Sequence, residues 1–351
     1  MGVALGLRRL PRHPARVAGC DNGAVKTAFT ELLGIDAPIV LAPMGGAVTS
    51  DFAAAVSNAG GIGMLAVSWN SPEAVGEIVT EMKALTNAPF GVNLIREWDQ
   101  RERLASALQA GAPVISLFWG DPAELVQEAH DGGALVFVTV ASADEAERAV
   151  AAGADVIVAQ GWEAGGHVRG TVTTLALVPR VVDAVTPVPV VAAGGIADGR
   201  GVAAVLALGA SGAWIGTRFL AAQEAPIHDD YRQRLFDAVE TDTYYGTLFD
   251  VGWPDAPHRA LRNTTVEAWE AAGRPEPGVR PGEADDVAAR ADGSPIKRYV
   301  SSTPHSSMTG DVETMPNWAG QGVGLVTHAQ PAAEIVRELV ADAERILAPP
   351  A

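Results

Sequence analysis

A single histidine in this chain stands where proton chemistry could occur, shortly after an apolar run. His167 follows the run 156–160 and comes directly after Gly165 and Gly166. These glycines leave space beside the imidazole, whose ordinary pKa of about 6.5 lets it act as an acid, a base or a charge partner near neutral pH. A histidine that only braces a loop is the alternative. The spacing of the other histidines predicts no metal site: His13, His130, His228, His258, His305 and His328.

Glycines at the ends of two other apolar runs could bind a phosphate. Gly194 and Gly195 follow the run 188–193, and Gly216 and Thr217 close the run 213–217. Backbone N–H groups at such turns can point toward a dianion, and the start of a following helix favours its charge. A pair of glycines that only permits a tight turn is the simpler interpretation. Two such loops, with a hydroxyl group from Thr217, together favour phosphate binding.

Two neutral amides lie at the ends of apolar runs and suit a ring-shaped ligand. Asn93 and Gln160 each offer a donor and an acceptor, which fits the edge of a flat heterocycle such as an isoalloxazine. Each amide could instead be a core residue bonded to the backbone. The stretch 43–45 could lie along the same ring, because Gly45 allows close approach and Met44 packs well on aromatic faces. Met44 as plain core filling is the alternative.

Several chemistries lack candidate residues. The chain has one cysteine, Cys20, and its lysines are Lys26, Lys83 and Lys297. A lone cysteine cannot form an internal disulfide, a cysteine-based zinc site or an iron–sulfur cluster. No lysine stands at the end of an apolar run, so a Schiff-base mechanism lacks its nucleophile. We therefore expect no metal site, and chemistry that depends on a bound organic cofactor.

The net charge of the chain disfavours some classes of binding partner. The formal net charge is −17, from 25 basic and 42 acidic residues, which opposes attraction to phosphate backbones and anionic membranes. No apolar run reaches the roughly 18 residues that a membrane-spanning helix needs. Arginines near the start follow a short apolar stretch, the reverse of a secretory signal. We expect a cytoplasmic protein with no nucleic-acid or membrane partner; an oligomer is possible, but the pattern predicts no oligomeric state.

The elements that must position these residues repeat one pattern from about Pro38 to Ala222. A short β-branched apolar run is followed by a Gly, Ser or Asp break, an Ala-rich helical stretch and then glycine. Eight runs predict strands, at 38–44, 63–67, 90–95, 114–119, 135–140, 156–160, 188–193 and 213–217. Eight strands separated by helices predict an α/β fold of the (β/α)8 TIM-barrel class, with its active site at the C-terminal ends of the strands. A doubly wound sheet is the alternative.

Helix ends are also marked in the sequence. Ser71-Pro72 and Asp121-Pro122 predict helix starts, and Ser142 with Glu145 fits a capping box. We expect left-handed glycines to close helices at Gly60, Gly111, Gly132, Gly153 and Gly209.

Composition divides the chain into four parts. We expect residues 1–25 to be a disordered extension, or the result of a start site placed too far upstream, and residues 26–223 to form the barrel. The proline-rich, charged segment 224–317 predicts an inserted lid domain, partly helical around 261–272. Residues 318–351 return to the barrel, where the amphipathic stretch 331–347 would be the closing helix.

Five segments resemble the nitronate monooxygenase family, formerly the 2-nitropropane dioxygenases. They are Ala42–Gly46, Gly91–Leu94, Ala159–His167, Ala193–Arg200 and Gly216–Leu220. The similarity covers roughly residues 27–230 and resumes at Trp318–Gly322. The resemblance implies an FMN-containing barrel in which His167 is the active-site histidine. It implies FMN contacts from Asn93, Gln160, Gly165, Gly195, Trp214, Ile215, Gly216 and Thr217, to which the patterns above add Ala42, Pro43, Met44 and Gly194.

The resemblance implies an oxidoreductase that converts alkyl nitronates, or nitroalkanes, with O2 to carbonyl compounds and nitrite. An NAD(P)H-dependent FMN reductase of the same barrel, acting on a quinone or an enoyl thioester, is the nearest alternative. A non-redox phosphate-binding barrel lacks the lysine or metal ligands that an aldolase needs. A flavin-binding protein without turnover is the remaining possibility. Most of the segment 224–310 does not resemble the family, so the residues that face the substrate stay open.

Overall fold

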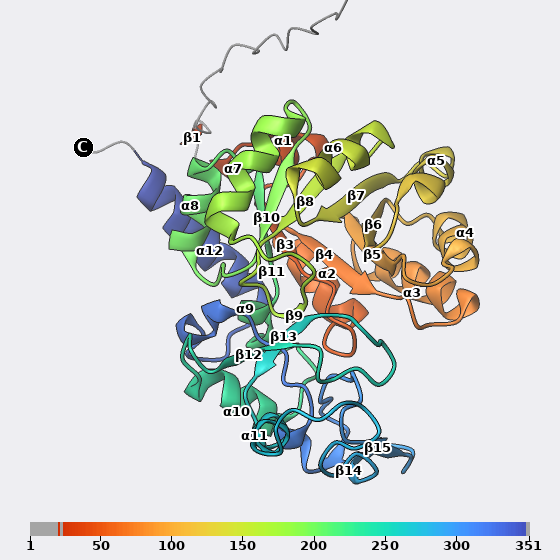
Figure 1. Ribbon diagram of the computed structural model, residues 1–351. Helices are drawn as coiled ribbons and strands as arrows, with labels where there is room; N and C mark the ends of the chain where they lie inside the picture. Colours follow the sequence, from red (N-terminus) through yellow and green to blue (C-terminus); the bar gives the residue numbers. More distant parts are fainter. Residues whose placement is uncertain (1–19, 22–23, 349–351) are drawn as a thin grey trace, which may run out of the picture.

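The computed structural model describes residues 20–21 and 24–348, and its larger part is a closed barrel of eight parallel strands (Figure 1). In chain order the strands are β3 (Ile39–Leu41), β4 (Ile62–Ala66), β5 (Phe90–Ile95), β6 (Val114–Phe118), β7 (Leu135–Val140), β8 (Val156–Gln160), β10 (Val190–Ala193) and β11 (Gly212–Ile215). Each pairs with its neighbour in this order, and β11 pairs with β3 to close the ring. The predicted TIM barrel is confirmed, and the doubly wound sheet is excluded.

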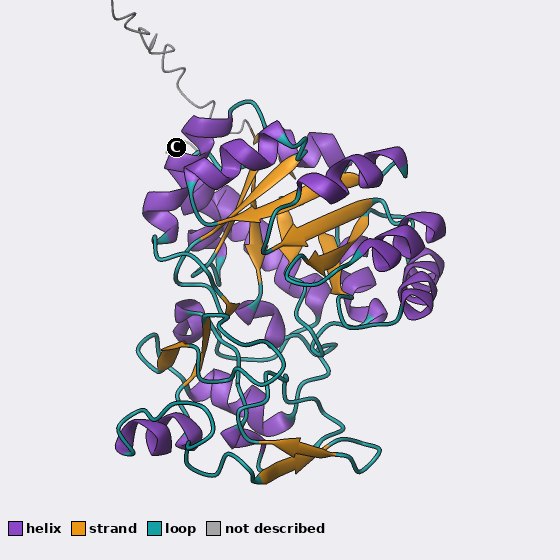
Figure 2. Ribbon diagram, turned by 45° about the vertical axis from the view of Figure 1, so that its right-hand side comes forward, coloured by secondary structure: helices purple, strands orange, loops and turns teal. Residues whose placement is uncertain are grey.

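Helices surround the strands on the outside of the barrel (Figures 1 and 2). They are α2 (Ser50–Asn58), α3 (Pro72–Leu85), α4 (Arg101–Ala110), α5 (Ala123–Asp131), α6 (Ala143–Ala151), α7 (Thr174–Val185), α8 (Gly199–Ala207) and α12 (Ala332–Leu347). The last helix, α12, packs against both α8 and α2. The end of the chain therefore supplies the helix that completes the outer ring.

Both faces of the strands are buried, which explains why their sequences are continuous apolar runs. One set of side chains fills the barrel interior, including Val40, Met64, Val158 and Trp214. The alternate set, including Leu41 and Ile215, packs against the surrounding helices. Phe29 of α1 (Ala28–Leu33) closes the N-terminal end of the barrel, where its ring meets that of Phe137 edge-on at 5.8 Å.

Most predicted helix ends are confirmed, with two local differences. The Ser71 side chain accepts the N–H of Ala74 at the start of α3. Glu145 accepts the N–H of Ala141 rather than that of Ser142, so the expected capping box is incomplete. The predicted left-handed Gly132 has a φ of −80°, and Gly133 takes that conformation instead with a φ of +80°. The first strand is also shorter than expected, because Ala42–Met44 leaves the ladder to line the strand ends.

The segment 224–317 contains more sheet than we predicted (Figure 1). Its helices are α10 (Asp229–Asp237) and α11 (Thr264–Ala271), and its strands are β12 (Thr243–Gly246), β13 (His258–Leu261), β14 (Asp286–Ala289), β15 (Pro295–Lys297) and β16 (Thr309–Gly310). The expected helix at 261–272 begins later, at Thr264, because Leu261 ends β13 and the Asn263 side chain caps the helix. A short 3-10 turn, η1 (Val312–Thr314), precedes the return to the barrel, where a second, η2 (Gln321–Leu325), follows.

One inserted sheet joins the barrel loop that carries the candidate histidine. Strand β13 pairs with β12 on one side and with β9 (Gly166–His167) on the other, both antiparallel. Strand β9 lies in the loop after β8, at the C-terminal ends of the barrel strands. The inserted segment therefore adds its strands directly to the predicted active-site loop, and its position depends on that pairing.

Four residues of the expected extension, 20–21 and 24–25, lie in the described part of the chain. Cys20–Asp21 (β1) and Ala24–Val25 (β2) pair as two short antiparallel strands, and Val25 is buried against the barrel. The rest of the predicted extension lies outside the described residues. In the described part of the chain, no helix is both long and apolar enough to cross a membrane.

Candidate active site

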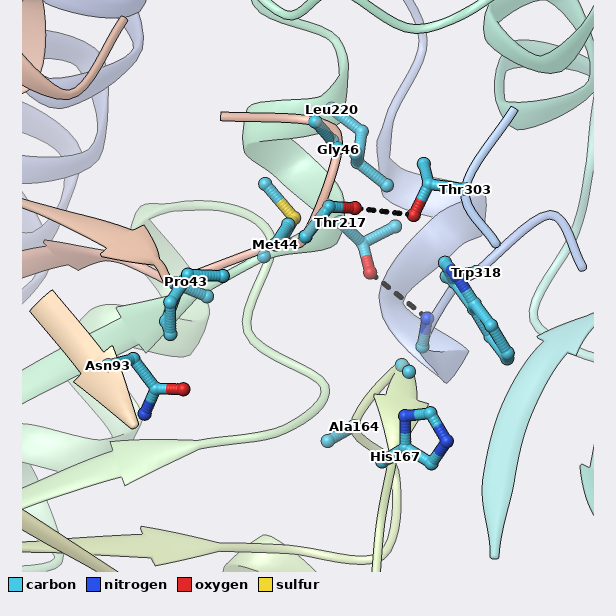
Figure 3. A pocket seen from close by; sticks show the side chains of 18 of the residues that line it. Pro43, Met44, Gly46, Asn93, Ala164, His167, Thr217, Leu220, Thr303 and Trp318 are labelled. Atoms are coloured by element: carbon cyan, nitrogen blue, oxygen red, sulfur yellow. Dashed lines mark hydrogen bonds between the residues drawn. The ribbon is translucent and has the colours of Figure 1, made fainter. Parts of the chain in front are cut away.

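A cavity of about 770 Å³ opens at the C-terminal ends of the barrel strands (Figure 3). Its walls come from the barrel, the inserted segment and the returning stretch 318–322. The residues predicted from the sequence that line it are Ala42, Pro43, Met44, Asn93, Gln160, Gly165, His167, Gly194, Gly195, Trp214, Gly216 and Thr217. We call this space the barrel cavity.

Ile215 is the predicted contact whose side chain the fold places elsewhere. Its neighbour Trp214 points into the barrel interior and lines the cavity, whereas Ile215 is buried against the outer helices. Successive residues of a strand point to opposite faces, so both could not face the same ligand. The side chain of Ile215 is therefore not a cofactor contact.

Glycines shape one end of the barrel cavity. Gly194 and Gly195 have φ angles of +110° and +72°, and a Cβ on Gly194 would stand 2.9 Å from the Gly161 carbonyl oxygen. Within the described residues, the N–H groups of Gly195 and Gly216 donate to no other protein group. The Thr217 hydroxyl accepts the N–H of Gly320 at 3.0 Å. This end offers free backbone donors in a cradle that side chains would fill, which suits a phosphate group.

The two amides are each fixed by one protein partner. Asn93 Nδ2 donates to the backbone oxygen and the hydroxyl of Ser116, at 3.3 and 3.2 Å. Gln160 Nε2 donates to the His167 carbonyl oxygen at 3.2 Å. The amide oxygen of Asn93 points toward the cavity (Figure 3). Each amide nitrogen is thus bonded within the protein, as in a core residue, while both side chains also line the cavity, where they could meet a ligand.

The stretch after β3 forms a flat wall. Gly45 lies under the ring of Trp69, where an added Cβ would come within 3.2 Å of the indole. The Thr303 hydroxyl of the inserted segment donates to the Gly45 carbonyl oxygen at 2.6 Å. Met44 packs against two separate clusters of buried apolar residues, and it also lines the cavity. Trp69 therefore approaches Gly45 closely, and the contact of this stretch with a ligand ring stays a prediction.

His167 lines the cavity and lies among aromatic rings. The Trp253 ring stacks on its imidazole with centroids 4.0 Å apart and an angle of 29° between planes. The rings of Trp318 and Trp119 lie 5.5 and 6.5 Å away. The Nε2 atom is buried and has no hydrogen-bond partner in the described chain. Burial lowers the pKa of His167 to about 3, with a smaller contribution from His258, so the free imidazole is neutral.

The two glycines before His167 have different tasks. Gly166 has a φ of +70°, and an added Cβ there would meet no atom within 4 Å. A Cβ on Gly165 would stand 2.5 Å from the Gly320 backbone nitrogen. Gly166 therefore provides the turn that leaves space by the histidine, as expected. Gly165 instead allows the returning segment to approach, which the Gln321 N–H secures by donating to Glu163.

His258 lies directly beside His167, with the ring centroids 5.6 Å apart. Its Nδ1 lies 3.0 Å from the Ala256 carbonyl oxygen, and its Nε2 accepts the N–H of Phe249 at 3.2 Å. These two bonds select the neutral Nδ1–H tautomer. Burial lowers the pKa of His258 to about 4. The pair therefore consists of two neutral imidazoles, of which only His167 lines the cavity.

The family model for nitronate monooxygenase matches this chain over residues 26–102 and 95–342. The chain belongs to the nitronate monooxygenase family. A nitronate monooxygenase of Pseudomonas aeruginosa is 34% identical over 89% of this chain and 97% of its own. A (3aS,4S,5R,7aS)-5-hydroxy-7a-methyl-1-oxo-octahydro-1H-indene-4-carboxyl-CoA dehydrogenase of Mycobacterium tuberculosis is 37% identical over 71% of this chain and 70% of its own. The solved structure of FabK from Thermotoga maritima superposes with a TM-score of 0.79, at 32% identity, over 92% of this chain and 97% of that chain.

Membership of the nitronate monooxygenase family makes the chain an oxidoreductase of a flavin-dependent family, as predicted. Among the described residues, no three His, Cys, Asp or Glu side chains are grouped as metal ligands. The Lys83 and Lys297 ammonium groups bond to the carbonyl oxygens of Ala110 and Ala284, away from the cavity. In the described part of the chain, the cavity lining therefore includes the imidazoles of His167 and His305 and no lysine or cysteine.

The sequence analysis missed the aromatic residues around His167. Trp69, Trp98 and Trp119 each come shortly after a barrel strand, which was a usable signal, because loops at that end of a TIM barrel carry the active site. Trp253 and His258 had no such signal. They reach His167 because β13 pairs with β9, a long-range contact that no local pattern in a nitronate monooxygenase sequence predicts.

Proposed function

We propose that this chain is an FMN-dependent nitronate monooxygenase, which oxidises alkyl nitronates with O2 to carbonyl compounds and nitrite. One observation carries the proposal. A single cavity is lined both by a glycine cradle with free N–H donors and by His167, whose buried Nε2 atom has no hydrogen-bond partner in the described chain. Such a cavity can hold a phosphate at one end and a small reacting group at the other.

The residues present fit FMN. The cavity of about 770 Å³ is within the range of cofactor sites. The N–H groups of Gly195 and Gly216 would hold the phosphate, and Asn93 and Gln160 would meet the edge of the flavin ring. Bound FMN supplies the electron-accepting and O2-reactive chemistry, so the protein needs no nucleophile of its own.

His167 would meet the substrate in its neutral form. An imidazole with a pKa of about 3 is a weak base toward carbon-bound protons, because a general base works best when its pKa is near the working pH. A nitronate has already lost that proton. Its negative charge beside Nε2 would favour the protonated imidazole and raise the pKa of His167 again. The geometry therefore supports nitronates over neutral nitroalkanes as substrates.

The experiment is a visible spectrum of the purified holoenzyme, followed by addition of ethyl or propyl nitronate in air. We expect a flavin spectrum, consumption of O2 and release of nitrite. A colourless protein that FMN cannot reconstitute would remove the basis of the proposal. A yellow protein without nitrite release would contradict nitronate oxidation and leave flavin binding intact.

A flavin reductase that uses NAD(P)H to reduce a quinone or an enoyl thioester is the second candidate. The similarity to FabK and to a dehydrogenase named for a CoA thioester supports it. Anaerobic mixing of the holoenzyme with NADH separates the two. Rapid bleaching of the flavin band would favour the reductase, and an unchanged band favours nitronate monooxygenase chemistry.

A further inference from the structure

Four tryptophans form a continuous aromatic surface beside the barrel cavity, which we call the tryptophan wall. Trp69, Trp98 and Trp119 come from the loops after β4, β5 and β6, and Trp253 comes from the inserted segment. The Trp253 ring lies 5.1 Å from both Trp98 and Trp119, and 6.4 Å from Trp69. Trp69 and Trp253 line the cavity directly, and the other two lie behind them.

The tryptophans of the wall differ in how much of each side chain is exposed. Trp69 is 56% exposed and lines the cavity, whereas Trp253 is 3% exposed and belongs to a buried cluster with Ile95 and Ala256. Trp119 has a φ of +66°, a strained conformation for a bulky residue, and the Arg169 guanidinium lies 5.7 Å above its ring. Strained residues and exposed apolar surface both concentrate where ligands bind.

The charges around the cavity point to an anionic ligand. The chain has a net charge of −17, yet no Asp, Glu or Lys of its described part lines the barrel cavity. Arg290, at the end of β14, does line it. The exposed Arg290 guanidinium donates to the Ser294 hydroxyl and to the Pro295 carbonyl oxygen. An anion entering this cavity therefore meets no repulsive carboxylate on its wall.

We propose that the tryptophan wall binds the organic part of the substrate, and that this enzyme prefers ring-bearing anions to small alkyl nitronates. This inference rests on the proposed function, because the anionic group it considers is the nitronate that reacts beside His167. A flat ring can pack against Trp69 and Trp253 while the charged group points toward the imidazole. A methyl or ethyl group would leave most of the wall in contact with water.

The magnitude follows from the apolar contact that a ring adds. Each buried methylene contributes roughly fourfold in affinity, and a favourable aromatic pair contributes between about twofold and tenfold beyond area. We expect kcat/KM for the nitronate of 1-nitro-2-phenylethane to exceed that for ethyl nitronate at least about tenfold, mainly through KM. In Trp69→Ala this ratio should fall several-fold. Trp269→Ala is the matched control, because Trp269 packs against Tyr244 and Arg274 outside the cavity.

A binding measurement tests the wall without turnover. We would titrate the holoenzyme with phenylacetate and with acetate and follow the change in the flavin spectrum. We expect phenylacetate to bind at least about tenfold more tightly, and Trp69→Ala to remove most of that difference. Equal affinities, or a Trp69→Ala variant that keeps the full preference, would overturn the inference. Loss of FMN from Trp69→Ala would assign the residue to the cofactor instead.

The two proposals can fail separately. Turnover of ethyl nitronate without a preference for the ring-bearing nitronate would refute substrate binding by the tryptophan wall, and the proposal of nitronate oxidation would stand. A preference for phenylacetate in a protein that oxidises no nitronate would overturn nitronate oxidation, and the wall would then select the substrate of another flavin reaction.

Discussion

Replacement of Trp253 should raise the pKa of His167. The two rings are stacked 4.0 Å apart, closer than any other aromatic ring to this imidazole. Burial lowers the pKa of His167 from 6.5 to about 3, and Trp253 covers one whole face of the ring. In Trp253→Ala, water would reach that face and stabilise the charged form. We expect the pKa to rise by at least about 1 pH unit, or roughly 1.4 kcal/mol.

The Trp253→Phe variant distinguishes the loss of apolar cover over His167 from other effects of replacing Trp253. A phenyl ring keeps most of the apolar cover, so the pKa of His167 should stay close to that of the original protein. Near neutral pH the aromatic neighbours of the imidazole carry no charge, since His258 is held as the Nδ1–H tautomer and the others are tryptophans; burial is the larger cause of the shift and His258 the smaller. No carboxylate takes part in the shift, so salt should change it little.

The assay is NMR titration of the histidine Cε1–H signals in the holoenzyme without substrate, with the His167 signal assigned by its loss in His167→Asn. Trp269→Ala is again the control. If the His167 pKa were the same in Trp253→Ala as in the original protein, burial by this ring would not be the cause of the shift.

Three further predictions concern the same site. His167→Asn should lose a much larger share of the rate with neutral nitroethane than with ethyl nitronate, measured by nitrite release; wild-type-like rates on both would refute any role for the imidazole. Gly194→Ala should release FMN during gel filtration, because its Cβ would meet the Gly161 carbonyl oxygen at 2.9 Å, whereas Gly133→Ala, with a similar positive φ and no contact, should keep it. The free energy of unfolding should fall as the pH drops below about 6.5, because His167 and His258 take up protons in the unfolded chain but not when they are buried. Each histidine should lower the free energy of unfolding by roughly 1.4 kcal/mol per pH unit. This loss should continue down to the folded-state pKa, about 3 for His167 and about 4 for His258. Urea unfolding at pH 7.5 and 5 measures this decrease in the free energy of unfolding, and the decrease should be smaller in His258→Gln.

The barrel was predictable because its signals are local and repeated. Runs such as 90–95, 135–140 and 156–160 match β5, β7 and β8 residue for residue. Their neighbours in space are also their neighbours in sequence, so counting the runs was enough to predict the fold. The same rule placed His167 at the cavity, because residues that follow barrel strands meet at one end.

The inserted segment was not predictable in the same way. Strands β12 to β16 are short, and β13 is recognisable only through its pairing with β9, far away in the sequence. A four-residue strand carries too little alternation to be distinguished from a loop. Our prediction therefore named the helix at 261–272 and missed the strand whose end overlaps it. It also missed His258, whose importance depends entirely on that pairing.

The barrel and the inserted segment contribute different residues to the candidate active site. The barrel loops supply the glycine cradle and the amides, which depend on strand ends that any member of the fold shares. The inserted segment supplies Trp253 and His258, and through them the low dielectric that keeps His167 neutral. Substitutions in the insertion can thus change the protonation of the imidazole and the shape of the substrate wall without disturbing the cradle.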